Sequence, residues 1–464
     1  MSACLLELFT FLSFLIYFIL SLSSRKGAIV PLSRVLSFVG VAIALLTLGS
    51  SGELFGGAYR VDLFSQIFKA LVAMGLFLVL LMGEGEKEVE GRWAPEFAMF
   101  LTLSALGLML LVSAQELITV YVALELSSFS LYIVIPLRRG QTGLELEAAA
   151  KYIFFGAISS GVMLYGMGYL YGLVGSTYLE DIVPGLLGAG SGPMVTMALV
   201  LALSGFFFKL ALFPFHFWCP DVYEGASNQT TTFIATVPKI GAVALLIRLA
   251  FLAPKEAEGF VEMLILLSAL SMTLGNIVGL VQRDIKRLLA YSGIAHAGYL
   301  LMGILALSKE GGASAIYYIA VYLFMNLGLF LVVMILSQRG ENVLIDDLKG
   351  LWKRAPLLAF TLAVSAFSLA GIPPTGGFAG KLFVFMAAFH QGHLDIVIIG
   401  AVNTAISLFY YLNLVRYAYS RDPERSDPVE LSLREKVLCY LFIIVVIFLG
   451  LFPNTFLTLM RASF

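Results

Sequence analysis

The chain has 464 residues, of which 60% are hydrophobic and only 13% are charged, and its formal net charge is −1. Because soluble domains contain about 25% charged residues, this composition predicts a polytopic membrane protein, and the balanced charge gives no support to nucleic-acid binding. The three cysteines (Cys4, Cys219 and Cys439) lie far apart, with no CxxC pair, and the four histidines form no HExxH motif. We therefore expect no cofactor and no metal site within this chain.

The first apolar stretch covers residues 3–22 and is followed by positive charges at Arg25 and Lys26. A cleavable signal peptide has its positive charges first, so this order predicts a retained helix. A membrane span needs about 20 predominantly apolar residues. Fourteen stretches meet this requirement: 3–22, 29–48, 61–83, 94–113, 115–136, 147–174, 194–224, 228–250, 260–281, 285–307, 313–337, 355–390, 394–419 and 434–456. We therefore predict an all-α membrane protein with about 14 transmembrane helices.

Lysine and arginine are divided unequally between the connections. The connections after odd-numbered spans contain seventeen of them, whereas the connections after even-numbered spans and the two termini together contain five. Cytoplasmic loops of membrane proteins are enriched in lysine and arginine. We therefore predict that the odd-numbered connections face the cytoplasm and that both termini lie on the outer side.

Two of the predicted spans contain helix-breaking residues near their middle. The seventh span carries Pro214, and the twelfth carries Pro373 and Pro374 followed by Gly376 and Gly377. Proline removes a backbone donor and clashes with the preceding turn. Unpaired backbone at membrane depth persists only where it is buried in protein or lines a cavity. We therefore predict a broken helix in each of these two spans.

The two breaks occupy equivalent positions in two sets of five helices. Spans four to eight form one set, spans nine to thirteen form the other, and the break falls in the fourth helix of each. An odd number of helices per set turns the second copy upside down, as in inverted-repeat transporters. We predict an N-terminal three-helix segment (1–93), a first inverted repeat (94–253), a second inverted repeat (254–420) and a C-terminal helix (421–464).

Four ionisable side chains lie deep within apolar spans: Glu125, Lys209, Lys239 and Lys381. A charge at the bilayer centre costs about 3 kcal/mol, so such residues usually face a protein interior or a water-filled path. Lys and Glu can take up and release a proton, which Arg does not do in proteins. We interpret the four as candidate proton-transfer groups. The alternative is a structural role, in which each is paired with a neighbouring helix and Lys381 holds the first half of the broken twelfth span.

A buried glutamate–lysine contact can supply the energy that proton transfer across a membrane requires. Moving one proton against about 150 mV costs roughly 3.5 kcal/mol, which corresponds to a pKa change of about 2.5. Desolvation and a neighbouring opposite charge change the pKa of a buried group by amounts of this size. We expect Glu125 and Lys209, both in the first repeat, to act as such a titrating pair.

Two histidines, His216 and His296, fall within apolar segments and are candidates to relay protons near neutral pH. The alternative for each is a core residue whose hydrogen bonds are satisfied. Lys151 lies near the cytoplasmic end of its helix, where its long side chain is expected to reach the interface. Lys69 lies in the third span, outside both repeats, and its role stays open.

Five segments carry a resemblance to a known family: FKLALFPFHFWCPDVYEGA, VPKIGAVALLIRL, IKRLLAYSGIAHAGYLLMG, FSLAGIPPTGGFAGKLFVFMAA and GAVNTAISLFYYLNLVRYAY. Together they resemble the antiporter-like subunits of respiratory complex I, a family that includes the Mrp antiporters. The sequences of two segments, SLAGIPPTGGFAGK and YSGIAHAGYL, are most similar to the N type (NuoN type). The likeness is densest from about residue 115 to residue 420. The chain stops soon after the fourteenth span and so departs from the L type, which carries a long lateral helix.

The resemblance implies proton translocation driven by quinone reduction elsewhere in a NADH:quinone oxidoreductase complex. It matches the family's glutamate of the fifth helix to Glu125, the lysine before the seventh-helix break to Lys209, and the lysines of the eighth and twelfth helices to Lys239 and Lys381. It also implies that flavin, iron–sulfur clusters, NADH and quinone bind to partner subunits. The expected partners of this chain are neighbouring antiporter-like subunits, small helical subunits and the lipid bilayer. The expected location is the bacterial inner membrane, with both termini periplasmic.

Two other functions stay open at this point. A secondary Na⁺/H⁺ antiporter subunit of the Mrp type would use the same lysines with an added cation site. A structural subunit would use its buried ions only to fix the register of the helices. Partner proteins that carry flavin and iron–sulfur clusters would favour the respiratory complex, because an Mrp complex contains none.

Overall fold

The computed structural model describes residues 2–23, 29–83, 88–140, 143–188, 193–252, 258–337, 340–420 and 428–464. The α-helices are α1 (Leu5–Ser21), α2 (Ile29–Leu46), α3 (Leu63–Met82), α4 (Ala94–Ser113), α5 (Leu117–Val134), α6 (Leu144–Val174), α7 (Leu179–Gly188), α8 (Pro193–Leu210), α9 (Trp218–Gly225), α10 (Asn228–Leu252), α11 (Glu258–Gly279), α12 (Ile285–Ile304), α13 (Lys309–Leu336), α14 (Leu351–Arg354), α15 (Pro356–Ala370), α16 (Gly376–His390), α17 (Leu394–Ser420), α18 (Leu433–Leu451) and α19 (Pro453–Arg461). Strands β1 (Gly52–Leu54) and β2 (Tyr59–Val61) form a short antiparallel hairpin.

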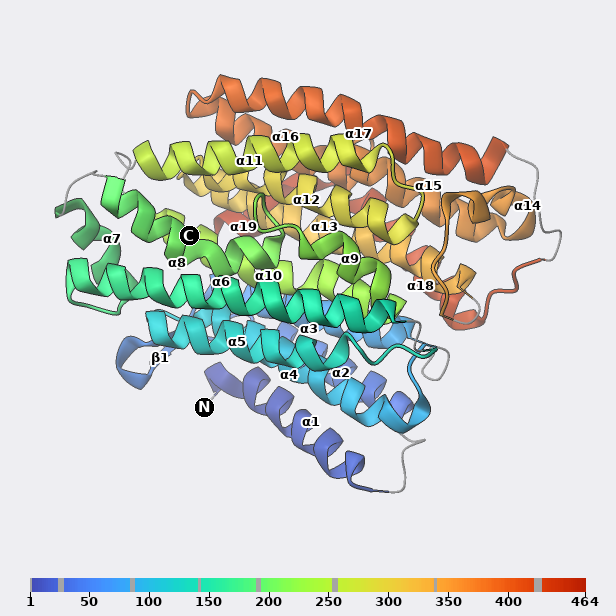
Figure 1. Cartoon of the computed structure of the whole chain (residues 1–464), viewed down its shortest axis with the longest axis horizontal. Helices are drawn as coiled ribbons and strands as arrows, with labels where there is room; N and C mark the ends of the chain where they lie inside the picture. Colours follow the sequence, from blue (N-terminus) through green and yellow to red (C-terminus); the bar gives the residue numbers. More distant parts are fainter. Residues whose placement is uncertain are drawn as a thin grey trace.

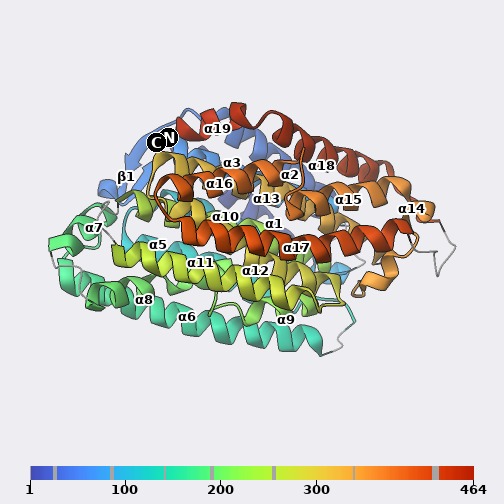
Figure 2. The ribbon, with the colours of Figure 1, turned by 90° about the horizontal axis from the view of Figure 1, so that it is seen from above.

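The long helices lie side by side along the longest axis of the molecule (Figures 1 and 2). Helices α10 and α13 are buried along most of their length, whereas α2, α6, α11 and α17 leave most of their residues at least partly exposed. Apolar residues on all sides of a helix are typical of a protein core or a membrane span. The core therefore lies around α10 and α13, and the apolar outer helices are suited to contact lipid.

Every predicted span contains at least one described helix, which confirms the all-α membrane class. Among the described residues, nine helices are long and apolar enough to cross a membrane, or ten if α18 and α19, bent by 77°, count as one span. Four further helices are apolar but shorter than a membrane span: α1, α15, α16 and most of α8. The hairpin β1–β2 and the short helices α7 and α14 are additions that the apolar pattern does not predict. The count of fourteen spans stays a prediction.

Both breaks lie where the sequence predicts them, and their backbones have the same form. Helix α8 ends at Leu210 and α15 ends at Ala370. The next residues, Ala211 and Gly371, have φ angles of 57° and 88°, in the left-handed region. In each case the residue after that donates its N–H to a carbonyl five residues back, at 2.9 Å. This pattern is the Schellman motif that ends many helices, and α9 and α16 begin several residues later, at Trp218 and Gly376.

The two termini lie toward the same end of the bundle, where β1 and α7 are found, and α14 lies at the opposite end (Figures 1 and 2). Termini at one end agree with an even number of crossings. Part of the charge count behind the predicted orientation rests on residues outside the described ranges: Arg25, Lys26, Lys87, Lys255, Arg339, Arg421 and Arg425.

Helix α3 is fixed against α10 near the β1 end of the bundle. Asp62 caps α3 by accepting the N–H of Ser65 at 2.8 Å, and the Ser65 hydroxyl accepts the N–H of Asp62 at 2.9 Å. This reciprocal pattern is a capping box, which satisfies two backbone donors that a helix start leaves free. Arg248 of α10 donates to both carboxylate oxygens of Asp62 at 3.2 Å. The three-helix segment is thereby joined to the helix that carries Lys239.

Candidate functional site

Glu125 and Lys209 are both buried against α6 and do not contact each other. Glu125, in the middle of α5, accepts a hydrogen bond from the Ser160 hydroxyl of α6 at 2.5 Å. Lys209, at the end of α8, donates to the Tyr152 hydroxyl of α6 at 3.2 Å. Ser160 and Tyr152 are eight residues apart, or about 12 Å along the helix axis. The two predicted partners are therefore hydrogen-bonded to the same helix, about two turns apart.

Lys239 lies in the middle of α10 and reaches two other helices. Its ammonium donates to the Gly293 carbonyl of α12 at 3.1 Å and to the Tyr322 hydroxyl of α13 at 3.2 Å. The residue is 1% exposed. A Cβ at Gly293 would lie only 2.8 Å from the Lys239 nitrogen. The absence of a side chain at Gly293 is what lets the ammonium approach this carbonyl.

His296 on α12 is held between two tyrosine hydroxyls. Its Nδ1 lies 2.6 Å from the hydroxyl of Tyr318, and its Nε2 lies 3.1 Å from the hydroxyl of Tyr411. The Tyr411 hydroxyl also contacts the Ser292 hydroxyl. In a neutral imidazole one ring nitrogen donates and the other accepts. His296 can therefore pass a proton from one tyrosine to the other by exchanging the roles of its nitrogens.

Lys381 on α16 turns back toward the broken end of α15. Its ammonium donates to the carbonyls of Leu369 and Ala370 at 3.0 and 3.2 Å. The last carbonyls of a helix lack hydrogen-bond donors within the helix, and the Lys381 ammonium is the donor for these two. The nitrogen also lies 4.6 Å from the centre of the Tyr299 ring. The contact expected of a lysine that holds the end of the first half-helix is therefore present in this structure.

Aromatic rings fill the space between Lys239 and Lys381. The His296 ring lies 5.5 Å from that of Tyr322, which accepts from Lys239, and 5.8 Å from that of Tyr299, which lies beside Lys381. The hydroxyl of Tyr299 is in turn close to the side chain of Thr404, at 3.3 Å. The two lysines and His296 thus form one buried row, with tyrosines at each gap.

The tyrosines of this row are not apparent from the sequence, because a tyrosine in an apolar helix is most often a packing or lipid-facing residue. One signal was present: Tyr318 and Tyr322 are four residues apart on α13, so they lie on the same face of the helix. Tyr152 and Ser160, about two turns apart on α6, also lie on neighbouring parts of one helix face. Their roles depend on which lysine or carboxylate lies opposite, which the sequence of a single helix does not contain.

His216 lies in the break between α8 and α9, apart from this row. Its ring packs 5.6 Å from that of Phe213 and 4.4 Å from that of Phe217. Its Nδ1 is buried and has no hydrogen-bond partner among the described residues. The structure places His296, but not His216, among the tyrosines between Lys239 and Lys381, and the relay roles of both histidines stay predictions.

A set of ion pairs lies at the α14 end of the bundle. Asp221 of α9 pairs with Lys151 at 2.6 Å and with Arg287 at 2.8 Å, and Arg287 also pairs with Glu224 at 2.6 Å. Lys151 is partly exposed there, as expected for a lysine that reaches the interface. These groups are therefore paired, in place of the solvated charges that helix ends usually carry.

Two buried carboxyl groups also lie at the α14 end and are not apparent from the sequence. Glu88 accepts the backbone N–H of Gln229 at 2.8 Å, and Asp284 caps α12 by accepting the N–H of Arg287 at 2.9 Å. Burial raises the pKa of both carboxyl groups. Nearby, Lys286 donates to the Ala226 carbonyl at 2.9 Å. Each of these three charged groups is therefore hydrogen-bonded to the backbone of another part of the chain or of its own helix start.

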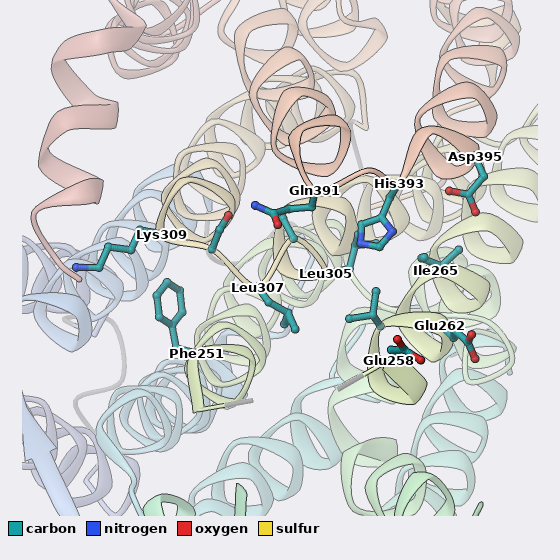
Figure 3. A pocket seen from close by; sticks show the side chains of 13 residues that line it. Phe251, Glu258, Glu262, Ile265, Leu305, Leu307, Lys309, Gln391, His393 and Asp395 are labelled. Atoms are coloured by element: carbon teal, nitrogen blue, oxygen red, sulfur yellow. The ribbon is translucent and has the colours of Figure 1, made fainter. Parts of the chain in front are cut away.

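A cavity of about 800 Å³ opens at the other end of the bundle, between α11, α13 and the turn from α16 to α17. Glu258 and Glu262 line it from α11, His393 and Asp395 from the turn and the start of α17, and Lys309 from α13 (Figure 3). None of the residues predicted from the sequence lines this cavity. Among the described residues, no group of three or more His, Cys, Asp or Glu side chains is placed to hold a metal ion.

Residues 114–407, more than half of the chain, match the family described as NADH:quinone oxidoreductase/Mrp antiporter, transmembrane. The chain belongs to this family. The matched range of the NADH:quinone oxidoreductase/Mrp antiporter family contains all six candidate residues of the sequence analysis, from Glu125 to Lys381. It leaves out helices α1 to α4, the end of α17, and α18 and α19.

Similar proteins agree with this family. NADH-quinone oxidoreductase subunit N 2 of Solidesulfovibrio magneticus is 48% identical over 407 residues, which cover 88% of this chain and 86% of that protein. A chain in the structure of respiratory complex I from Thermus thermophilus with bound aureothin is 33% identical, with a TM-score of 0.84 and 99% of each chain covered. A chain of the Mrp complex from Dietzia sp. DQ12-45-1b has a TM-score of 0.87 over 100% of this chain and 96% of its own, but at 20% identity this likeness shows the fold alone.

Proposed function

We propose that this chain is the proton-translocating N-type membrane subunit of a NADH:quinone oxidoreductase, with no redox centre of its own. The observation that carries the proposal is the buried row between Lys239 and Lys381. Tyr322 accepts a hydrogen bond from Lys239, the His296 ring packs between the rings of Tyr322 and Tyr299, and the Lys381 ammonium lies over the Tyr299 ring. The names of relatives such as the Solidesulfovibrio protein support the same activity. The electron transfer that drives the subunit takes place in its partner subunits.

The proposal includes a membrane topology. Fourteen spans are grouped into the N-terminal segment 1–93, inverted repeats 94–253 and 254–420, and the C-terminal part 421–464. The matching helix ends at the two breaks and the position of both termini at one end support it. The α14 end faces the cytoplasm, and the β1 end, with both termini, faces the periplasm of a bacterial inner membrane. The apolar outer helices contact lipid and the neighbouring membrane subunits.

Each candidate group has a place in the proposed route. Protons are taken up from the cytoplasm near Glu88 and Asp284, where buried carboxyl groups have raised pKa values. Glu125 and Lys209 form the pair whose contact is made or broken during the cycle, and in this structure they are apart. A proton on Lys239 then passes by Tyr322 and His296 to Lys381, and from there to the outer side. Water within the broken helices completes the route.

Purification of the intact complex tests the proposed function against the Mrp alternative. We expect this chain to copurify with partner proteins that contain flavin and iron–sulfur clusters and to support quinone reduction from NADH. Optical and paramagnetic resonance spectra of the purified complex would detect both kinds of centre. A complete complex that contains neither, yet exchanges Na⁺ for protons in vesicles, would favour the Mrp-type antiporter.

The position of Lys69 outside both repeats leads to a comparative prediction. We expect Lys69→Ala to lower proton pumping far less than Lys239→Ala, because only Lys239 lies in the buried row. Pumping would be measured in vesicles at matched levels of assembled complex. Equal losses of pumping in the two variants would contradict the prediction that the repeats contribute more to pumping than the N-terminal segment does.

The close approach at Gly293 gives a second prediction. In Gly293→Ala the new methyl group would lie 2.8 Å from the Lys239 nitrogen, so one of the two must move. We expect the helix to form, because alanine is the better helix residue, but pumping to fall by more than half. The matched control is Gly161→Ala, where a Cβ meets nothing within 4 Å. Normal pumping in the Gly293→Ala complex would show that this lysine contact is dispensable.

A further inference from the structure

A buried glutamate–lysine contact lies outside the row from Lys239 to Lys381. The carboxylate of Glu7 on α1 and the ammonium of Lys69 on α3 form an ion pair at 2.5 Å. The Tyr59 hydroxyl of β2 donates to the same carboxylate oxygen, Oε1, also at 2.5 Å. Lys69 is 0% exposed and Glu7 is 6% exposed. A desolvated contact of this kind was expected between Glu125 and Lys209, and it occurs here instead.

Several polar atoms around this contact lack hydrogen-bond partners. Glu7 Oε2 is buried and unpartnered, and the Lys69 ammonium, which carries three protons, has no hydrogen-bond partner besides its ion pair. The Gln66 side-chain oxygen, one turn before Lys69 on the same face of α3, is also buried and unpartnered. So is the Ser113 hydroxyl, which lies near Tyr59. Buried polar groups with such unmet donors and acceptors are usually bridged by ordered water.

The contact lies close to the β1 end of the molecule. Tyr59 belongs to the β1–β2 hairpin, and the next residue in that strand, Arg60, is exposed. Cys4, three residues before Glu7, is partly exposed. The hairpin and the first turn of α1 are therefore what separates the contact from the outer surface.

We propose that Glu7, Lys69 and Tyr59 form a hydrated proton-binding site on the outer side of the N-terminal three-helix segment. The ligand is a proton, carried by water from the outer face. On uptake, the Glu7 carboxylate becomes a neutral carboxylic acid, Lys69 keeps its three protons and the ion pair opens. Release of that proton to water restores the carboxylate and closes the pair. The role of this site in pumping rests on the proposed function.

A purely structural pair would look different. Leaving donors and acceptors of a buried ion pair unsatisfied is costly, so structural pairs are usually completed by protein groups. Here four side chains contribute unmet polar atoms, and the tyrosine hydroxyl stabilises the charged carboxylate from one side only. The site also lies outside residues 114–407, the range that matches the family model. It is therefore separate in the sequence from the row of Lys239, His296 and Lys381.

Infrared difference spectroscopy of the intact complex in lipid, between acidic and alkaline buffer, tests the site. We expect the wild-type complex to show a carbonyl stretching band of a protonated carboxylic acid that Glu7→Gln removes. The control is Glu180→Gln, at the same end of the molecule, where the carboxylate is exposed and pairs with Arg60 at 3.2 Å. That control should leave the band in place. Identical spectra for wild type and Glu7→Gln would overturn the proposal.

A double variant separates proton binding from helix anchoring. Glu7→Gln with Lys69→Met removes both charges, so that no unpaired buried charge destabilises the fold. We expect this complex to assemble, to lack the carbonyl band and to pump less than wild type, with a smaller loss than Lys239→Ala. Full pumping by the double variant would show that Glu7 and Lys69 have no part in pumping.

The Lys239→Ala complex, measured alongside, shows which of the two proposals has failed. If the chain does not translocate protons, Lys239→Ala pumps normally while the Glu7 band is still present in the wild type. If only the Glu7 site is wrong, Lys239→Ala loses pumping and Glu7→Gln leaves the spectrum unchanged.

Discussion

The Lys381→Arg complex is expected to assemble normally and to lose most of its proton pumping. Arginine keeps the positive charge and can donate to the Leu369 and Ala370 carbonyls that Lys381 now supplies. It does not release a proton at working pH, because its pKa is above about 12. A proton that arrives from Lys239 would therefore have no group at this position from which to leave. Pumping per quinone reduced, measured in reconstituted vesicles, gives the result.

The Lys381→Ala complex and a surface control complete this experiment. If Lys381 titrates, the alanine variant should be impaired as strongly as the arginine variant. If Lys381 only neutralises carbonyls at the end of α15, arginine should restore normal pumping and alanine alone should fail. The control is Lys349→Arg, because Lys349 is a partly exposed lysine at the α14 end, paired with Asp346 at 2.7 Å. Normal pumping by Lys381→Arg would assign the residue to structure and direct the search for the outward route to His296.

The second large effect is expected at the first repeat, where Glu125→Ala and Lys209→Ala should each strongly lower pumping while the complex still assembles. Each residue is buried and hydrogen-bonded to a neutral group of α6, so its removal breaks no direct ion pair in this structure. The cost to folding is then the loss of one hydrogen bond, about 1–3 kcal/mol. The cost to function is the loss of one member of the titrating pair.

A variant of Ser160 distinguishes the charge of Glu125 from its hydrogen bond. Ser160→Ala removes the donor at 2.5 Å and keeps the carboxylate. We expect this complex to keep more of its pumping than Glu125→Ala, measured at equal assembly. Full pumping in an assembled Glu125→Ala complex would show that the pair is not an essential element.

The fold was largely predictable because its main determinants are local. Apolar stretches of span length and prolines within two of them identify the helices and their breaks from the sequence alone. The short helix α7 and the β1–β2 hairpin were not predictable in this way, since neither has the length or periodicity of a span. The Schellman ends at Ala211 and Gly371 depend on backbone angles that residue types only suggest.

The candidate site was predictable only in part. A charged residue in an apolar stretch is conspicuous, so Lys239 and Lys381 could be chosen without a structure. Tyr322 and Tyr411 could not, because their partners lie on other helices and an aromatic residue in a membrane helix has many possible roles. Glu7 escaped notice for a different reason. A carboxylate in the first turn of a helix is usually solvated, and only the position of α1 in the bundle, where it packs on α4, shows that Glu7 meets Lys69 of α3.

The central claim is that protons cross the membrane through the buried lysines of this chain. Its most direct test is the number of protons translocated per NADH oxidised by the purified complex in sealed vesicles, compared between wild type and Lys239→Ala at equal quinone-reduction rates. We predict that Lys239→Ala, fully assembled, translocates fewer protons per NADH than wild type. An unchanged ratio in that complex would contradict the account.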